Sequence, residues 1–420
     1  MSFSESTLRS PGAAIAPSGL RQWRTWAWLG AEPISLIGDQ VFLVALTWTT
    51  VQVYGAGTTG LVLAAAAIPR VLLMLAGGVL VDRVGAKRLA LFSDAARSAL
   101  MLAAAAFVAT AGTPLAFLLV LAALFGAIDA VFYPATGALP PLVVTSDQLL
   151  RVQNLRALGT RAALIVGAPL GGGLIALGGV EICLLVNAIT FVVSTVGLAL
   201  LRTRPLSASA PSEAFTAQVV DGLRHAARHP LLRNLLLLVA LFEFALSGIV
   251  NVAYPFLADQ NGWGAEGFGL LLAGIGVGAG ATAAVLAVVS RTPAPGLVTA
   301  SCGLLGATLL ALFPFTAGLP VALALAVALG VVGGGVAGIA IPLVQHSVPA
   351  AQLGRAMSLF AIATVGTAPL SLAGTALLTR HAGLPATFLT AAALVLTAAF
   401  ACLTSRPLRA ATLASPHTPA

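Results

Sequence analysis

The sequence predicts an all-α integral membrane protein with about twelve transmembrane helices in two pseudo-symmetric halves of six. Of its 420 residues, 59% are hydrophobic and only 8% are charged, whereas a soluble domain carries about 25% charged residues. Its mean hydropathy is +1.02. Long apolar stretches follow one another with short breaks, and a single long polar connection lies near the middle of the chain. Such a composition cannot cover a water-soluble surface, so the chain must lie mostly within a bilayer.

The individual spans follow from length, because a helix needs about 20 apolar residues to cross the hydrocarbon core. Short turns that contain Gly or Pro separate the stretches that meet this length. The predicted spans are residues 25–53, 58–81, 89–111, 115–138, 155–177, 180–201, 233–257, 267–290, 296–314, 320–343, 353–378 and 384–404.

The long connection divides the chain into domains. Residues 1–24 form an N-terminal tail, 25–201 the first half, 202–232 the linker, 233–404 the second half and 405–420 a short C-terminal tail. The first 20 residues are polar and contain no cleavable apolar core, so no signal peptide is expected.

The linker has a pattern of its own. Phe215, Val219 and Leu223 recur every four residues, with charged residues off that stripe. This spacing predicts an amphipathic helix on the membrane surface; a plain solvated linker is the alternative.

Basic residues are unevenly distributed among the connections. They occur in the N-terminal tail, after every second span and in the linker, while the opposite loops contain acidic residues and Arg380 as their one cation. The positive-inside rule therefore places both termini and the linker in the cytoplasm. A single lysine among the 21 basic residues is typical of a GC-rich bacterial genome, which suggests a bacterial inner membrane. Because the cations lie between apolar spans, they indicate topology control and not nucleic-acid binding.

A distinctive loop follows the second span, where residues 78–88 read Gly-Val-Leu-Val-Asp-Arg-Val-Gly-Ala-Lys-Arg. Gly78 allows a neighbouring helix to approach closely. Asp82 can cap a helix end or pair with an arginine, and Gly85 permits a tight reversal. The basic pair at Lys87 and Arg88 holds the loop on the cytoplasmic side.

This segment resembles the loop motif between helices two and three of the major facilitator superfamily, G-x-L-x-D-x-x-G-x-[KR]-[KR]. Residues 68–70, 93–97, 133–140 and 222–233 are similar to the exporter branch, the drug:proton antiporter type, which includes macrolide and siderophore efflux proteins. The resemblance covers about residues 20–405. It implies conformational switching at Gly78, Asp82, Arg83 and Gly85.

The fifth span carries a further motif of small residues. Gly159 precedes the run Gly167-Ala168-Pro169-Leu170-Gly171-Gly172, which resembles the antiporter motif of the same family, with Ala168 where Gly is usual. Small residues permit close helix contact, and proline removes one backbone hydrogen bond. The resemblance implies a tight seal that limits leakage; ordinary helix packing is the alternative.

Several charges are predicted deep within the apolar spans, where each is costly and marks an ion or substrate path. Counted along the helices, Asp39 lies roughly 22 Å from the cytoplasmic edge and Arg70 roughly 18 Å, so an Asp39–Arg70 ion pair is predicted. Glu32 lies two turns before Asp39 on nearly the same face. Arg97 and Asp129 lie at similar depths in spans three and four.

Glu243, in the seventh span, has no cation near it in the sequence. Burial without a partner favours the protonated form of a carboxyl group. Asp39, Glu32 and Glu243 are therefore the candidate proton carriers, with Arg70, Arg97 and Asp129 as further residues of the network or cavity. The alternative is that the pairs serve only to hold helices together.

The predicted function is secondary active export of a small amphiphilic compound by alternating access, driven by proton antiport. No ATP motif, metal cluster or organic cofactor site is found, so an ion gradient supplies the energy. The expected partners are a small-molecule substrate, protons and the bilayer, and the expected state is a monomer. Two alternatives stay open: an importer or lipid flippase on the same scaffold, and a non-transporting sensor or enzyme. No nucleophile–base pair supports an enzyme, and the chain carries no extra soluble domain for sensing.

Overall fold

A computed structural model describes residues 19–204, 230–289, 294–316, 318–347, 359–360 and 362–409. Within these ranges, the side chains of residues 75–79, 82, 230, 346–347, 362 and 407 are not described. The linker helix predicted at Phe215, Val219 and Leu223 lies outside the described residues.

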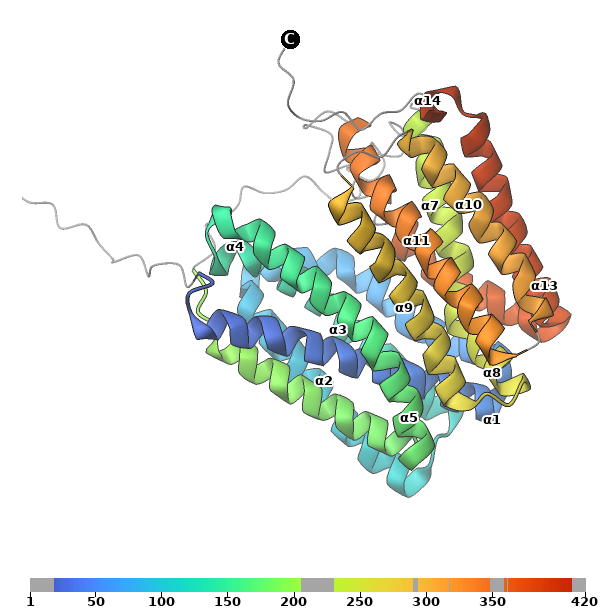
Figure 1. Cartoon of the computed structure of the whole chain (residues 1–420). Helices are drawn as coiled ribbons and strands as arrows, with labels where there is room; N and C mark the ends of the chain where they lie inside the picture. The colour runs from blue at the N-terminus through green and yellow to red at the C-terminus, as the bar shows by residue number, and fades with distance from the viewer. Residues whose placement is uncertain are drawn as a thin grey trace, which may run out of the picture.

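The described residues are almost entirely helical and contain no strand (Figure 1). The helices are α1 (Trp23–Val84), α2 (Ala86–Ala111), α3 (Leu115–Gly137), α4 (Pro140–Val143), α5 (Ser146–Leu200), α7 (Pro230–Gly248), α8 (Tyr254–Gln260), α9 (Gly264–Val288), α10 (Pro295–Leu312), α11 (Leu319–Ser347), α13 (Ala368–Thr404) and α14 (Arg406–Arg409). Two π-helical turns occupy Ile249–Ala253 and Ile362–Gly366, and a 3-10 turn occupies Phe313–Phe315.

Glycines divide three of the longest helices. α1 is broken at Gly55 (φ 76°), α5 at Gly179 (φ 70°) and α13 at Gly383 (φ 79°). These backbone conformations favour glycine because a Cβ atom would clash there. Nine helical stretches of the described chain are long and apolar enough to cross a membrane. Three of them are double, so the described residues supply twelve segments for crossing, in agreement with the predicted all-α membrane fold.

The predicted boundaries differ most at the fifth span. Its helix begins at Ser146, nine residues before the predicted start at residue 155. Its first turns carry Asp147 and Arg151. A prediction that looks for about 20 apolar residues in a row leaves such charged turns out of the span. A helix can continue beyond the hydrocarbon core into water, so hydropathy locates the crossing and not the whole helix.

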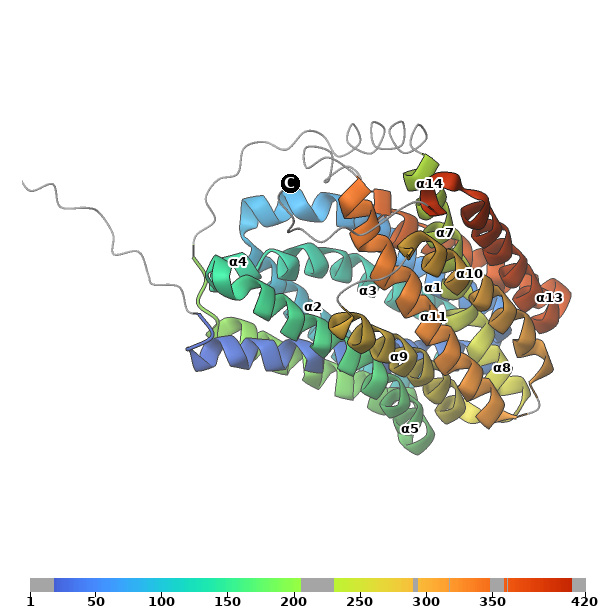
Figure 2. The same cartoon turned by 45° about the horizontal axis from the view of Figure 1, so that its top comes forward.

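The helices form two bundles, one from α1 to α5 and one from α7 to α14 (Figures 1 and 2). Inside the first bundle, α1 packs on α3 and α5; inside the second, α13 packs on α7 and α10. Each bundle has its own core of buried aliphatic and aromatic side chains. Among the described residues, the main contacts between bundles are α5 with α9 and α1 with α13, and α1 also touches α8, α9 and the π-helical turn Ile249–Ala253.

Among the described residues, the bundles meet closely toward one end. Gly60 lies against Leu372 and Ala376, and Gly269 lies against the backbone of Ala168. These residues lie between the middle of their helices and the helix ends that face away from α4 and α14. At the other end, α4 and α14 are widely separated (Figures 1 and 2). The two halves are therefore closed on the face opposite the start of α1 and the end of α14.

Candidate functional site

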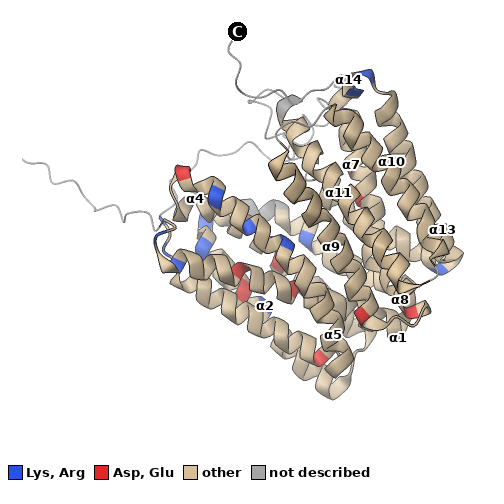
Figure 3. Ribbon diagram, in the orientation of Figure 1, with Lys and Arg blue, Asp and Glu red and all other residues tan. Residues whose placement is uncertain are grey.

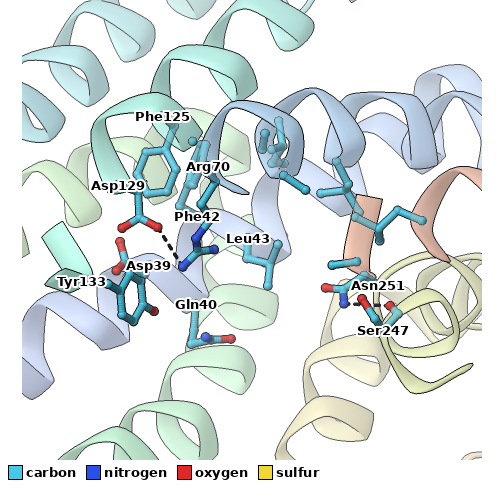
Figure 4. Close-up of a pocket in the computed structure, with 17 residues that line it drawn as sticks. Asp39, Gln40, Phe42, Leu43, Arg70, Phe125, Asp129, Tyr133, Ser247 and Asn251 are labelled. Atoms are coloured by element: carbon cyan, nitrogen blue, oxygen red, sulfur yellow. Dashed lines mark hydrogen bonds and ion pairs between the residues drawn. The ribbon is translucent and has the colours of Figure 1, made fainter. Parts of the chain in front are cut away.

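A cavity of about 320 Å³ lies between the two bundles, with walls of contrasting character (Figure 4). The first bundle contributes Asp39, Arg70 and Asp129 to it, while Ser247 and Asn251 face it from the second bundle. Aromatic and aliphatic side chains, including Phe42, Leu43, Leu46, Leu63, Phe125 and Leu372, cover much of the rest. The cavity thus combines an apolar surface with a few convergent polar groups, as small-molecule sites do.

Close helix crossings bring these charges together. Gly126 of α3 lies directly against the backbone oxygen of Ala66 in α1, where any Cβ would overlap it. Arg70 follows Ala66 by four residues and Asp129 follows Gly126 by three, so each lies about one turn beyond the crossing. The missing side chain at Gly126 therefore determines the distance between this arginine and this carboxylate.

Five charged side chains, of Asp39, Arg70, Asp94, Arg97 and Asp129, form one cluster in the first bundle. Figure 3 shows that several charged residues lie on the helices of this bundle. Arg70 Nη2 lies 2.8 Å from Asp129 Oδ2. Arg97 Nη1 lies 3.1 Å from Asp129 Oδ1 and 3.4 Å from Asp39 Oδ2, and its Nη2 lies 2.5 Å from Asp94 Oδ1. Arg97 is therefore the centre of the cluster.

Aromatic rings contact both arginines. The Arg97 guanidinium lies 4.0 Å from the ring centroid of Phe132 and 4.3 Å from that of Phe191. The Arg70 guanidinium lies 4.9 Å from the ring centroid of Tyr133. Such cation–π contacts strengthen when water is excluded, and they partly compensate for the loss of hydration. Arg97 is fully buried, whereas the Arg70 side chain is 37% exposed and faces the cavity.

The charge balance within the cluster is uneven. Three carboxylates, of Asp39, Asp94 and Asp129, face two guanidinium groups. Asp39 has the longest of the four ion-pair distances, and its Oδ1 atom is buried without a hydrogen-bond partner. A proton bound at Asp39 would leave two carboxylates for two guanidinium groups and remove the excess negative charge.

The predicted Asp39–Arg70 ion pair is wrong. Arg70 pairs with Asp129, and Asp39 pairs with Arg97. The prediction compared depths along two helices, but depth does not specify the direction in which each side chain points around its helix. The crossing at Gly126 turns Arg70 toward α3 instead.

Glu32 and Glu243 do not join this cluster. Glu32 accepts hydrogen bonds from Arg156 Nε at 3.0 and 2.9 Å, so its cation comes from α5 and not from the cluster. Glu243 lies partly buried in α7, and among the described residues no side chain pairs with it, as its surroundings in the sequence indicated. Neither carboxylate lines the cavity.

The prediction missed Asp94, Tyr133, Ser247 and Asn251. The spacing of Asp94 and Arg97, three residues apart on one helix, is a detectable ion-pair signal. Tyr133, Ser247 and Asn251 reach the cavity because of the way their helices are rotated, which the sequence does not reveal. Asn251 belongs to the π-helical turn Ile249–Ala253, a deviation that often occurs at functional sites.

The loop motif after span two is only partly described. Gly85 has φ 94° and separates α1 from α2, as its predicted role in a reversal requires. Lys87 Nζ donates hydrogen bonds to the carbonyl oxygens of Ala199 and Leu201, where the first bundle's last helix ends. Arg83 and Arg88 are exposed, the side chain of Asp82 lies outside the described residues, and Gly78 is described only as helical backbone.

The small residues of span five lie at helix contacts. Gly159 faces Pro33, Gly167 faces Gln40 and Ile37, and Gly171 faces Val41, all in α1. Gly172 instead faces Ala265 of α9, across the boundary between bundles. The helix continues through Pro169. One helix thus contacts both its own bundle and the opposite one.

Two bundles of membrane helices around a central cavity with buried charges form the architecture of a polytopic membrane transporter. The family model of the Major Facilitator Superfamily matches residues 33–364 and 236–419, so the chain belongs to this superfamily.

The relatives and structures similar to this chain agree with that family. The multidrug efflux pump Tap of Mycolicibacterium fortuitum is 29% identical over 84% of this chain and 88% of its own length. BacE of Bacillus amyloliquefaciens, named for bacilysin export, is 28% identical over 60% of this chain, which spans only 62% of BacE. A bacterial homologue of the iron transporter ferroportin in an inward-facing state has a TM-score of 0.72 at 15% identity, covering 93% of this chain and 99% of its own. A bacterial homologue of the lysosomal transporter Spinster, inward-facing and occupied, has a TM-score of 0.70 at 13% identity, covering 91% and 96%.

Proposed function

We propose that this protein exports a small amphiphilic compound, such as a drug, an antibiotic or a siderophore-like molecule, across the bacterial inner membrane. The cavity between the bundles supports this proposal most directly, because it joins an apolar wall to an ionisable cluster. The names of the relatives, a multidrug efflux pump and a bacilysin exporter, agree with outward transport of small compounds.

In this proposal the two halves rock about the cavity and expose it to one side at a time. The distribution of basic residues assigns the termini to the cytoplasm. Since the bundles are closed opposite the termini, the structure would then correspond to an inward-facing state, ready to receive substrate from the cytoplasm. A monomer contains both halves and is the proposed functional unit.

Proton antiport is the proposed energy source, with Asp39 as the proton-binding residue. With every carboxylate ionised, the cluster carries one excess negative charge inside the membrane domain, which is unfavourable. A proton on Asp39 removes that charge. Asp39 also lines the cavity, so each orientation of the transporter would bring it into contact with water on one side. Gain of a proton outside and its loss inside would then accompany each export cycle.

Reconstitution tests this function. Purified protein in liposomes with an acidic lumen should accumulate a fluorescent amphiphilic dye from a neutral exterior, and an ionophore that collapses the gradient should abolish accumulation. Protein-free liposomes provide the background. Should no member of a broad compound panel accumulate, the export proposal fails. Accumulation that follows a sodium gradient but ignores pH would contradict the choice of proton.

A further inference from the structure

A second cavity, also of about 320 Å³, lies where α1 turns into α2, far from the central cavity. Residues 84–88 form one side of it, and Leu142, Thr203 and Arg204 form the rest. The backbone N–H of Arg204 donates to the carbonyl oxygen of Leu142 at 3.0 Å. This bond holds together the segment that follows α5 and the short helix α4, so the cavity has a fixed frame from three separate parts of the chain.

The side chains that line this cavity are unusually basic. Three of the eight residues are Lys87, Arg88 and Arg204, and none of the eight is acidic. Around α4, Figure 3 shows mostly basic residues, with an acidic residue also beside this helix. Like charges so close to one another are unfavourable without a counterion. The cavity is therefore suited to an anion.

Arg204 supplies the most specific evidence. Its Nε and Nη2 atoms are both buried, and neither has a hydrogen-bond partner within the described part of the chain. Buried donors without acceptors are costly, and those of a charged group are the most costly. These two nitrogens lie side by side on the guanidinium edge that binds phosphate or carboxylate through two parallel hydrogen bonds. The residue is thus poised for a bidentate oxyanion.

Two further donors lie beside it. Lys87 Nζ uses two of its three N–H groups on the carbonyl oxygens of Ala199 and Leu201, which leaves one for a ligand. The cavity also includes the first residues of α2, a helix of 26 residues beginning at Ala86. The free backbone N–H groups at a helix N-terminus favour phosphate binding.

We propose that this cavity binds a phosphate group, and that its source is the headgroup of an anionic phospholipid. Gly85 joins two helices that each cross the membrane, so the cavity lies at the level of the lipid headgroups. Basic pockets between transmembrane helices at this level bind anionic headgroups. Inorganic phosphate offers the same chemistry, and the test separates the two sources.

The test uses the full-length protein in detergent, titrated with phosphatidylglycerol and observed by native mass spectrometry. Arg204→Gln and Arg88→Gln remove cations of the cavity, whereas Arg151→Gln removes an exposed cation in the first turns of α5, outside it. Lys87 is left intact because its contacts hold a helix end. We expect phosphatidylglycerol affinity to fall about tenfold in Arg204→Gln, less in Arg88→Gln, and to stay unchanged in Arg151→Gln.

The outcomes separate the possibilities without any transport measurement. If millimolar inorganic phosphate does not displace the lipid, and the zwitterionic phosphatidylethanolamine binds more weakly, the lipid source is supported. If inorganic phosphate binds equally well and displaces the lipid, the phosphate site stands but the lipid assignment is overturned. Equal lipid binding by the wild type, Arg204→Gln and Arg88→Gln would overturn the site itself. Because the readout is binding, it is independent of whether the protein exports anything.

Discussion

Arg97 Nη1 lies 3.1 Å from Asp129 Oδ1 where both side chains are almost completely shielded from solvent, at 0% and 3% exposure. Arg97→Gln would leave three carboxylates with Arg70 as their one cation in the cluster. Removing one partner of a buried ion pair costs about 3–5 kcal/mol, so we expect a clearly lower unfolding temperature in detergent, measured by intrinsic tryptophan fluorescence.

A double variant controls for loss of packing around Arg97. Asp94 pairs with Arg97 alone in this cluster, so Arg97→Gln combined with Asp94→Asn should recover part of the lost stability. A double variant no more stable than Arg97→Gln would show that the loss comes from the aromatic enclosure and not from charge.

Asp39→Asn should uncouple transport from protons. The amide resembles the protonated acid but cannot release a proton, so dye accumulation driven by a pH gradient should fall at least about tenfold. Exchange of labelled for unlabelled dye across liposomes at equal pH should persist. Glu243→Gln is the matched comparison, because Glu243 is a second carboxylate within a transmembrane helix but lies away from the cavity. Proton-driven accumulation by Asp39→Asn at the wild-type rate would remove Asp39 as the carrier.

Gly126→Ala should destabilise the first bundle, because its Cβ would overlap the backbone oxygen of Ala66. Backbone cannot move aside as a flexible side chain can, and overpacking costs about 1–3 kcal/mol. Gly137→Ala is the control in the same helix, since among the described residues no atom from a neighbouring element lies within 4 Å of its Cβ position. Thermal unfolding of both variants in detergent measures the difference. Equal unfolding temperatures would mean that the crossing tolerates a methyl group.

Asp259→Ala, which removes the acceptor oxygen, should shift the balance between the two orientations of the transporter. Gln52 Nε2 donates to Asp259 Oδ1 at 2.5 Å and connects the two bundles on the closed face. Because this bond is exposed, its loss should cost about 0.5–1 kcal/mol, a two- to fivefold population change. Spin labels at exposed Leu150 and Phe400 on a cysteine-free background should report a larger population with the shorter separation. Glu266→Gln, a nearby exposed acid, should leave the distribution unchanged.

The twelve crossings follow from local properties of the chain. Hydrocarbon requires about 20 apolar residues per helix and satisfied backbone hydrogen bonds. Reversals need residues that accept a positive φ, which Gly55, Gly179 and Gly383 provide. Both requirements can be recognised in a single sequence, so hydropathy and the Gly-containing turns were sufficient to predict the fold class. The start of α5 was misplaced because its polar first turns lie outside the apolar stretch.

The sequence by itself determined that charges are buried in the first half and at what depth. Which arginine meets which carboxylate was decided by the tertiary structure, through contacts such as that of Gly126 with Ala66. A position along a helix fixes height, whereas pairing also depends on rotation about the helix axis and on the angle between neighbours. These quantities arise from packing among several helices, so no single span could reveal that Arg70 belongs to Asp129 and Arg97 to the centre of the cluster.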